Sequence, residues 1–289
     1  MKRLVVPVGI VGVLVAIGWL LRPPAGHVPV EYESPGMHDF EFHDLAVIHF
    51  GNSSAFDFVI NKPMLQLIIS GILILAFFIP ISRKLTIIPK KWQFCVEYIY
   101  DFVRSGIART SIGHNYEKHV PFLVSIFVLV LMNNWFGEFF YFMFPTFANI
   151  GYTMGVVLVV WIAYIGAGIG EHGLKYFMVQ LLPGGVPLWL APLVMPLEFM
   201  SAFITRPLTL TIRLFGNMFA GHLGVLVFVV GGGWLVSEST SLLYNVAGFG
   251  SFALSLLIIA IELFIGFMQA YLFTLLSANY IASSVSHGH

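Results

Sequence analysis

Five ionisable side chains interrupt the last two long apolar stretches of this 289-residue chain, residues 186–235 and 246–281. They are Glu198, Arg206, Arg213, His222 and Glu262. Apolar stretches of this length are typical of membrane-spanning helices. A charge at bilayer depth costs roughly 2.5–3.5 kcal/mol on insertion scales. Each of these side chains is therefore a candidate for a functional site.

Arg213 is the hardest of the five to explain by packing alone. Glu198 and Arg206 are nearer one end of their stretch, where a long side chain can snorkel to water. Arg213 lies seven residues beyond Arg206, a helical rise of roughly 10 Å. A guanidinium stays protonated in proteins, so this positive charge is permanent. We expect it to need water or a carboxylate, and its own helix face carries none, which favours a partner outside this chain.

The stretch 246–281 has polar side chains that would face those of 186–235 if the two stretches form an antiparallel hairpin. Facing positions then pair Arg213 with Gln269 and His222 with Glu262 in one register. Glu262 and Gln269 are seven residues apart and share a helix face.

On the first stretch, Asn217 shares a face with Arg213. His222 lies about half a turn round, so it should approach from the side unless Gly216 or Gly221 permits a bend. A His222–Glu262 pair could pass protons, because histidine titrates near neutral pH and a carboxylate accepts and releases protons. A static buried hydrogen bond is the alternative interpretation.

The composition indicates an integral membrane protein. The chain is 58% hydrophobic and 10% charged, and its mean hydropathy is +0.89, whereas soluble domains are about one-quarter charged. The 14 basic and 14 acidic residues cancel, so net charge gives no indication of a nucleic-acid partner. The single cysteine, Cys95, excludes an internal disulfide framework and a cysteine-based metal cluster. The histidines between residues 22 and 62 match no metal-ligand spacing, and we expect neither a metal nor a cofactor.

The sequence predicts an all-α polytopic fold with five core transmembrane helices, the last two forming a long tilted antiparallel hairpin. The predicted spans are Met64–Ser82, Val120–Phe144, Gly151–Gly170, one tilted or broken helix within 186–235, and Val246–Ile281. Residues 1–21 fit a signal peptide or a membrane anchor, and we expect an uncleaved anchor. Residues 22–62 then form an external segment and residues 63–289 the membrane domain.

Lys90–Arg109 predicts a different kind of helix. Its apolar residues recur at three- and four-residue spacing, with charged residues opposite, as in an amphipathic helix that lies in the membrane interface. A packing helix of the soluble type is the alternative. Residues 83–118 hold seven basic and three acidic residues, whereas residues 22–62 hold two basic and six acidic ones. This bias places 83–118, and by counting spans the C-terminus, in the cytoplasm.

The run Pro-Leu-Thr-Leu-Thr-Ile-Arg-Leu-Phe-Gly-Asn-Met, which contains Arg213, resembles the signature helix of subunit a of the F-type ATP synthase. Glu262 with Gln269, Met132-Asn133 and the amphipathic Lys90–Arg109 segment also resemble that family. The resemblance covers about residues 60–281, and its wording looks most like actinobacterial members. It implies a bacterial plasma-membrane protein with no catalytic activity of its own.

The resemblance also implies roles for the polar residues. Arg213 would face the carboxylates of a rotating c-ring and separate two half-channels. The external half-channel would be lined or flanked by Asn217, His222, Glu262 and Gln269. Glu198 would belong to the cytoplasmic half-channel, although it lies one residue farther from Pro207 than in several members. The implied partners are the c-ring subunits, peripheral stalk subunit b, the other ATP synthase subunits and the lipid bilayer.

Two other classes of protein fit the sequence less well than this function does. A secondary ion transporter often shows inverted repeats, but the sequence has no visible internal symmetry, and an arginine without an internal counter-ion would be costly there. A membrane-bound zinc hydrolase would need a motif such as His-Glu-x-x-His, which is missing. The sequence does not distinguish proton from sodium coupling, because the ion site would lie on the ring.

Overall fold

The computed structural model describes residues 32–40, 44–48, 58–83, 85–113, 115–138, 145–173, 176, 190–238 and 242–285. The anchor expected at 1–21, much of the external segment 22–62 and the end of the span predicted to reach Phe144 lie outside these residues. Contacts divide the chain into two units, each described by itself below. Unit 1 comprises Met1–Phe42 and Phe219–Phe264, and unit 2 comprises His43–Met218 and Ile265–His289.

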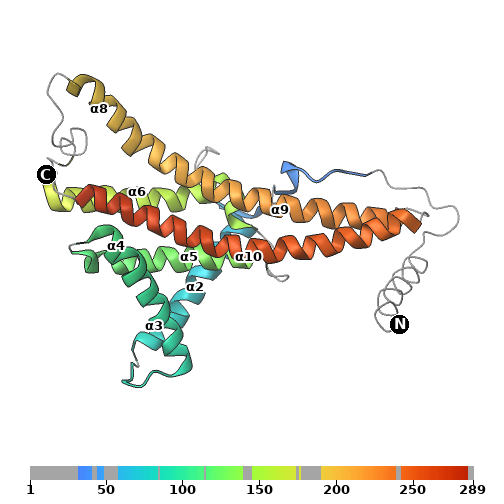
Figure 1. Ribbon diagram of the computed structural model, residues 1–289, viewed down its shortest axis with the longest axis horizontal. Coiled ribbons are helices and arrows are strands. Elements are labelled where there is room, and N and C mark those ends of the chain that lie inside the picture. Colours follow the sequence, from blue (N-terminus) through green and yellow to red (C-terminus); the bar gives the residue numbers. More distant parts are fainter. Residues whose placement is uncertain are drawn as a thin grey trace, which may run out of the picture. The chain divides into compact units, whose positions relative to one another are not determined.

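The described chain is almost entirely helical, as the sequence predicts (Figure 1). Five helical segments are long and apolar enough to cross a membrane. They are α2 (Lys62–Ser82), α5 (Val120–Glu138), α6 (Ile150–His172), the continuous run Ala191–Ser237, and α10, for which Leu243–Val285 qualifies. At 1.5 Å per residue, even the 19 residues of α5 approach the roughly 30 Å of a bilayer core.

Residues 191–237 form one continuous helix, one of the two forms expected, and it contains a π-helical turn. Helix α8 (Ala191–Met200) continues through a π-helical turn, Ser201–Thr205, into α9 (Arg206–Glu238). Helix α10 spans Leu242–Val285, slightly longer than predicted. Single π-turns inside α-helices often occur at functional sites. This one rotates α9 relative to α8 and so sets which residues of α9 face outward.

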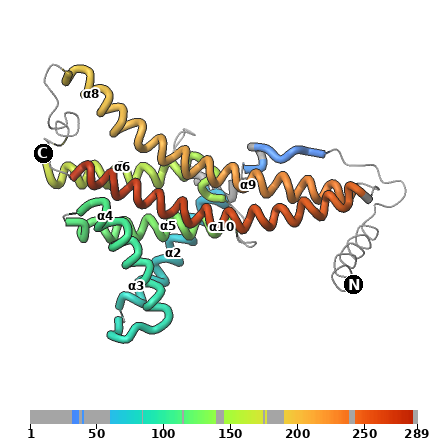
Figure 2. Tube along the Cα trace, viewed as in Figure 1, coloured from blue at the N-terminus to red at the C-terminus, as the bar shows by residue number. Residues whose placement is uncertain are grey.

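The predicted amphipathic helix forms as α3 (Lys91–Val103), a π-turn (Arg104–Ala108) and the short α4 (Arg109–Ile112). Helix α3 follows α2 through residues 83–90, and the two helices form a hairpin whose tip projects beyond the rest of unit 2 (Figure 2). Val103 and Ile107 are fully buried at its other end, where α3 and the π-turn contact α5.

Two of the spans of unit 2, α2 and α6, begin at an asparagine. The side chain of Asn61 accepts a hydrogen bond from the Met64 amide at 3.1 Å and caps α2. Asn149 caps α6 in the same way through the Gly151 amide, at 2.9 Å. Before α2, strands β1 (Asp44–Ile48) and β2 (Phe58–Asn61) pair antiparallel. This small ribbon was not expected from the sequence.

Candidate functional site

His222 and Glu262 come together in unit 1, as the hairpin register predicts. His222 Nδ1 lies 3.9 Å from Glu262 Oε2, and the two side chains are only 12% and 10% exposed. This distance exceeds a direct hydrogen bond. Proton transfer needs about 2.6–3.2 Å between heavy atoms or one intervening water. The pair is thus arranged for transfer through a water molecule or after a small side-chain movement.

Gly221 makes room for this pair. A Cβ atom on Gly221 would overlap Glu262 Oε1 and would lie 2.6 Å from Glu262 Cδ. The carboxylate of α10 is therefore seated against the backbone of α9 at a position that only glycine leaves open. The sequence suggested only that Gly221 permits a bend, whereas in the structure its missing side chain leaves room for the Glu262 carboxylate.

Small residues hold α9 and α10 close together elsewhere in unit 1. Ser251 Oγ donates a hydrogen bond to the Phe228 carbonyl at 2.7 Å. A Cβ on Gly248 would lie 2.9 Å from the Gly232 carbonyl oxygen, so the two backbones are nearly in contact there. Close approach at small residues is a usual way for membrane helices to pack. This close approach fixes the register of α9 against α10 and so brings His222 opposite Glu262.

Arg213 lies in unit 2 on an exposed face of α9. Its sequence neighbours at three and one residue, Leu210 and Leu214, are 1% and 0% exposed and face the interior of the chain. Leu208 and Ile212, by contrast, are 51% and 55% exposed. Within the described residues, no carboxylate lies within ion-pair distance of the Arg213 guanidinium.

The exposed face of α9 is mainly apolar or weakly polar apart from Arg213. It includes Thr205, Leu208, Thr209, Ile212, Arg213, Asn217 and Ala220. Asn217 thus shares the face of Arg213, as predicted. Gln269, the hairpin partner expected for Arg213, is instead 5% exposed. No hydrogen bond joins Gln269 to Arg213 among the residues that the structure describes.

Gln269 lies near a chain of buried polar side chains that crosses unit 2. Asn134 donates a hydrogen bond to the Gly266 carbonyl, one turn before Gln269, at 3.0 Å. The neighbouring Asn133 donates to Ser70 Oγ at 2.9 Å. Gln66, one turn before Ser70, is 3% exposed. The chain therefore runs from α2 through α5 to α10.

Several atoms of this chain have no protein partner within the described part of the structure. They are Oε1 and Nε2 of Gln66, Oδ1 of Asn133, Oδ1 of Asn134 and Nε2 of Gln269. Buried polar groups are normally satisfied, and sites with several such groups are where ordered water binds. Asn133 and Gln269 were expected from the sequence, whereas Gln66, Ser70 and Asn134 were missed. The available signal was a glutamine and a serine four residues apart in one apolar span, and two adjacent asparagines in another.

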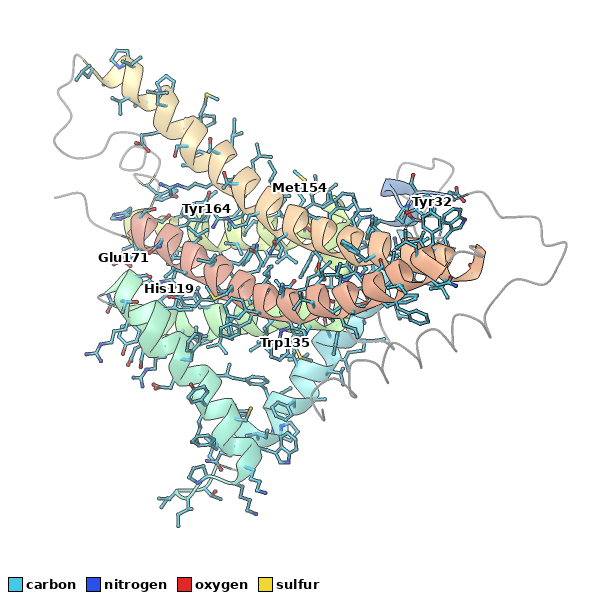
Figure 3. All side chains as sticks on the ribbon, turned by 45° about the vertical axis from the view of Figure 1, so that its right-hand side comes forward. Tyr32, His119, Trp135, Met154, Tyr164 and Glu171 are labelled. Carbon is cyan, nitrogen blue, oxygen red and sulfur yellow. The ribbon has the colours of Figure 1, made fainter. Side chains whose placement is uncertain are left out.

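Arg206 is fastened to α10 within unit 2. It donates a hydrogen bond to Ser283 Oγ at 2.9 Å, and its guanidinium carbon lies 5.2 Å from the centre of the Tyr280 ring. Tyr164 of α6, labelled in Figure 3, donates to the Ala202 carbonyl inside the π-turn at 2.5 Å. These contacts hold the start of α9, and hence the direction in which Arg213 points.

Glu198 is on α8, three residues before the π-turn and well before the other predicted residues in the sequence. Its side chain is partly exposed on α8. The structure does not bring it into contact with Arg206, which bonds to α10 instead. The sequence-predicted residues therefore fall into two groups: the His222–Glu262 pair in unit 1, and Arg213, Asn217, Gln269 and Glu198 in unit 2.

Comparisons with a family model and with individual proteins agree on one family. Residues 64–282 match the family model described as ATP synthase A chain. A protein from Nocardioides sp. described as ATP synthase subunit a is 39% identical over 264 residues, covering 89% of this chain and 95% of that protein. Proteins of the same description from Streptomyces lividans and Gluconobacter oxydans are 35% and 34% identical over 260 and 248 residues. They cover 89% and 86% of this chain, and 89% and 95% of their own lengths.

Proposed function

Because the chain belongs to the ATP synthase A chain family, we propose that it is the stator subunit that conducts protons past a rotating c-ring in the membrane sector of an F-type ATP synthase. It would supply two half-channels and one essential arginine, Arg213. It would have no catalytic activity alone and would act within a rotary proton-translocating ATPase. Its partners would be the c-ring, peripheral stalk subunit b and the other subunits of the complex.

The observation that carries this proposal is the exposure of Arg213 on a membrane-spanning helix. A permanently charged group cannot be left against lipid without large cost. Arg213 has no carboxylate within ion-pair distance among the described residues, and its surroundings on α9 include the exposed Leu208 and Ile212. A partner that brings a carboxylate to this face satisfies the guanidinium.

The proposed mechanism follows from the electrostatics of that encounter. A ring carboxylate arriving at Arg213 is stabilised in its charged form, so its pKa falls and it releases a proton. When rotation carries it back into lipid, the charged form becomes costly and the carboxylate must first take up a proton. Rotation is thereby coupled to transfer in one direction, provided that no water path bypasses Arg213.

The external half-channel would use His222 and Glu262 as a proton relay, and Asn217 and Gln269 would line or flank the channel, as the family implies. The 3.9 Å separation of the relay atoms and their low exposure support this role. The buried amides of Gln66 and its neighbours on α5 support a hydrated path, because their unpartnered atoms suit bound water. Glu198, partly exposed on α8, would serve the cytoplasmic half-channel.

The proposed placement is a bacterial plasma membrane, with residues 83–118 and the C-terminus in the cytoplasm. Residues 1–21 would be an anchor or signal segment, residues 22–62 external, and residues 63–289 the membrane domain.

A cross-linking experiment tests which face meets the ring. In a Cys95→Ser background, Ile212→Cys should form a disulfide with a cysteine placed near the mid-helix carboxylate of the ring subunit. Leu214→Cys, two residues away, serves as the matched control, because Leu214 is fully buried and should not cross-link. Leu210, which is also buried, should likewise fail to reach the ring. Equal cross-linking at both positions, or none at Ile212, would count against the proposed face.

Functional assays test the charge itself. Arg213→Ala should abolish ATP-driven acidification of inverted membrane vesicles, measured with a pH-sensitive dye, while the complex still assembles. Arg213→Lys should also fail, because an ammonium lacks the planar fork and can lose its proton when buried. A carbodiimide should block flow by modifying the ring. If its inhibitory adduct instead mapped to Glu262 or Glu198 with the ring unmodified, the secondary-transporter alternative would replace the motor.

A further inference from the structure

The loop that joins α2 to α3 exposes large apolar side chains. Leu85, Ile87 and Ile88 are 63%, 102% and 84% exposed, and Trp92 at the start of α3 is 70% exposed. We call the described residues between 83 and 92 the tip. Aliphatic side chains this exposed are unfavourable in water. Their grouping within one short segment indicates a surface that is covered in the assembled protein.

The tip is held in a defined conformation. The buried side chain of Gln93 binds Thr86 three times: its Oε1 accepts from the Thr86 amide at 3.2 Å and from Thr86 Oγ1 at 3.0 Å, and its Nε2 donates to the Thr86 carbonyl at 2.9 Å. Gln93 Nε2 also donates to Glu97 Oε1 at 2.7 Å. These bonds fasten the loop at Thr86 to the start of α3. Ile87 and Ile88, which follow Thr86 directly, are thus held in a segment of fixed conformation while they remain exposed.

Basic residues surround the apolar ones. The tip sequence Arg-Lys-Leu-Thr-Ile-Ile-Pro-Lys-Lys-Trp has four basic residues and no acidic one. Lys90 and Lys91 are exposed, as is Arg83. Clustered basic side chains beside apolar ones and a tryptophan are typical of segments that bind the headgroups and outer acyl region of anionic lipids.

The position of the tip fits such a surface. Helix α2 qualifies as a membrane span and ends at Ser82, so residues 83–90 emerge where that span reaches the headgroups. The hairpin of α2 and α3 projects beyond the other elements of unit 2, which leaves the tip free to meet a lipid leaflet (Figures 1 and 3). Phe94 and Tyr98 continue the exposed aromatic surface along α3, and their rings lie 6.2 Å apart.

We propose that the tip, residues 83–92, is an anchor that binds anionic phospholipid headgroups and inserts Ile87 and Ile88 below them. Lys90 and Lys91 recognise the negative headgroups, and Gln93 preorganises the loop so that little ordering remains to be done on binding. A lipid leaflet suits this surface better than a protein partner does. The exposed basic side chains of Arg83, Lys90 and Lys91 beside exposed apolar ones match the negative surface of an anionic leaflet, and the tip lies at the depth where the headgroups begin. The anchor goes beyond ion translocation, because it concerns no residue of the proposed proton path.

The first test measures depth in the complete complex. A cysteine replaces Ile87 in a Cys95→Ser background and is labelled with an environment-sensitive nitrobenzoxadiazole dye. In nanodiscs containing phosphatidylglycerol, we expect blue-shifted emission and quenching by lipids that carry a shallow doxyl group. Ser105→Cys, exposed beyond α3, is the control and should be quenched much less. Water-like emission from position 87 in all nanodiscs, or shielding with no lipid quenching, would overturn the proposal; the second outcome would indicate a protein partner.

The second test measures charge recognition. Anionic and neutral brominated lipids are compared as quenchers of the dye at position 87. One basic residue near a charged surface contributes about fivefold in local lipid preference. Lys90→Gln with Lys91→Gln should therefore lower the anionic preference at least fivefold. Arg109→Gln with Lys118→Gln removes the same charge from exposed positions outside the tip and should leave the preference unchanged. Equal quenching by both lipids in the unmutated tip, or equal losses in both double variants, would refute anionic recognition.

A third measurement needs no substitution, so it does not depend on a variant that assembles. A photoactivatable phosphatidylglycerol in membranes that contain the native complex should cross-link to the peptide that holds residues 83–92. A phosphatidylcholine probe with the same photoactivatable group should label it several-fold less. Labelling confined to other segments of the chain would refute the anchor.

Discussion

Gly221→Ala should impair proton flow while leaving the protein assembled. The added Cβ would lie 2.6 Å from Glu262 Cδ and would overlap its carboxylate oxygen. Non-bonded carbon atoms prefer about 3.5–4.0 Å. The Glu262 carboxylate must therefore retreat by about 1 Å, which enlarges a His222–Glu262 separation that is already 3.9 Å.

The cost of this displacement should appear in function rather than in stability. The group that must move is the end of a flexible side chain, and alanine improves a helix by about 0.5–1 kcal/mol relative to glycine. A misplacement of about 1 Å at a reacting group can lower a rate by roughly 100-fold. We expect a loss of that order in proton flow wherever the relay limits the overall rate.

ATP-driven acidification of inverted vesicles, with the amount of assembled complex determined by blotting, measures this loss. Gly233→Ala is the matched control: it makes the same substitution in α9 and no other atom lies within 4 Å of the added Cβ. It should pump normally.

Two results would refute the reasoning. Normal pumping by Gly221→Ala would mean that the position of the Glu262 carboxylate does not limit proton transfer. Loss of assembled complex in Gly221→Ala but not in Gly233→Ala would mean that the close approach of the two helices serves packing and not the relay.

Three further predictions concern other parts of the chain. His222→Glu and Glu262→His should each impair proton flow by placing two like groups together, and the double exchange should recover some of it in the same vesicle assay. Ser105→Cys, in a background without Cys95, should react with a membrane-impermeant thiol reagent from the cytoplasmic side only. Burial and the nearby Lys118 lower the pKa of His119, and Glu171, at the same end of unit 2 (Figure 3), partly offsets them. The protein should therefore lose stability as the pH is lowered below about 6.5, the ordinary pKa of histidine. Thermal unfolding of the purified complex should show a smaller loss for His119→Gln.

The sign of the His119 effect follows from linkage. A lowered pKa means that the folded state binds a proton less readily than the unfolded state, so acid favours unfolding. Equal pH dependence in the unmutated protein and His119→Gln would contradict it. A double exchange of His222 and Glu262 no better than the worse single variant would contradict their pairing, and labelling of Ser105→Cys from outside would reverse the topology.

The sequence by itself predicted the helical architecture and the residues with costly charges. Hydropathy is a local property, and each span needs only its own run of apolar residues, so α2, α5, α6 and α10 begin within four residues of their predicted starts. Arg213 could be singled out for the same reason, since the cost of a charge at bilayer depth does not depend on its neighbours. The constant register of an antiparallel hairpin sufficed to pair His222 with Glu262.

Only the tertiary structure decided which groups meet and which face outward. The π-turn at Ser201–Thr205 changes the helical phase that a regular period assumes, and Arg213 lies outward while Leu210 and Leu214 lie inward. The role of Gly221 depends on a side chain from another helix, forty-one positions later in the chain. The polar chain from Gln66 to Gln269 likewise joins three helices. Contacts of this kind depend on helix rotation and distance, which composition and spacing along one segment do not specify.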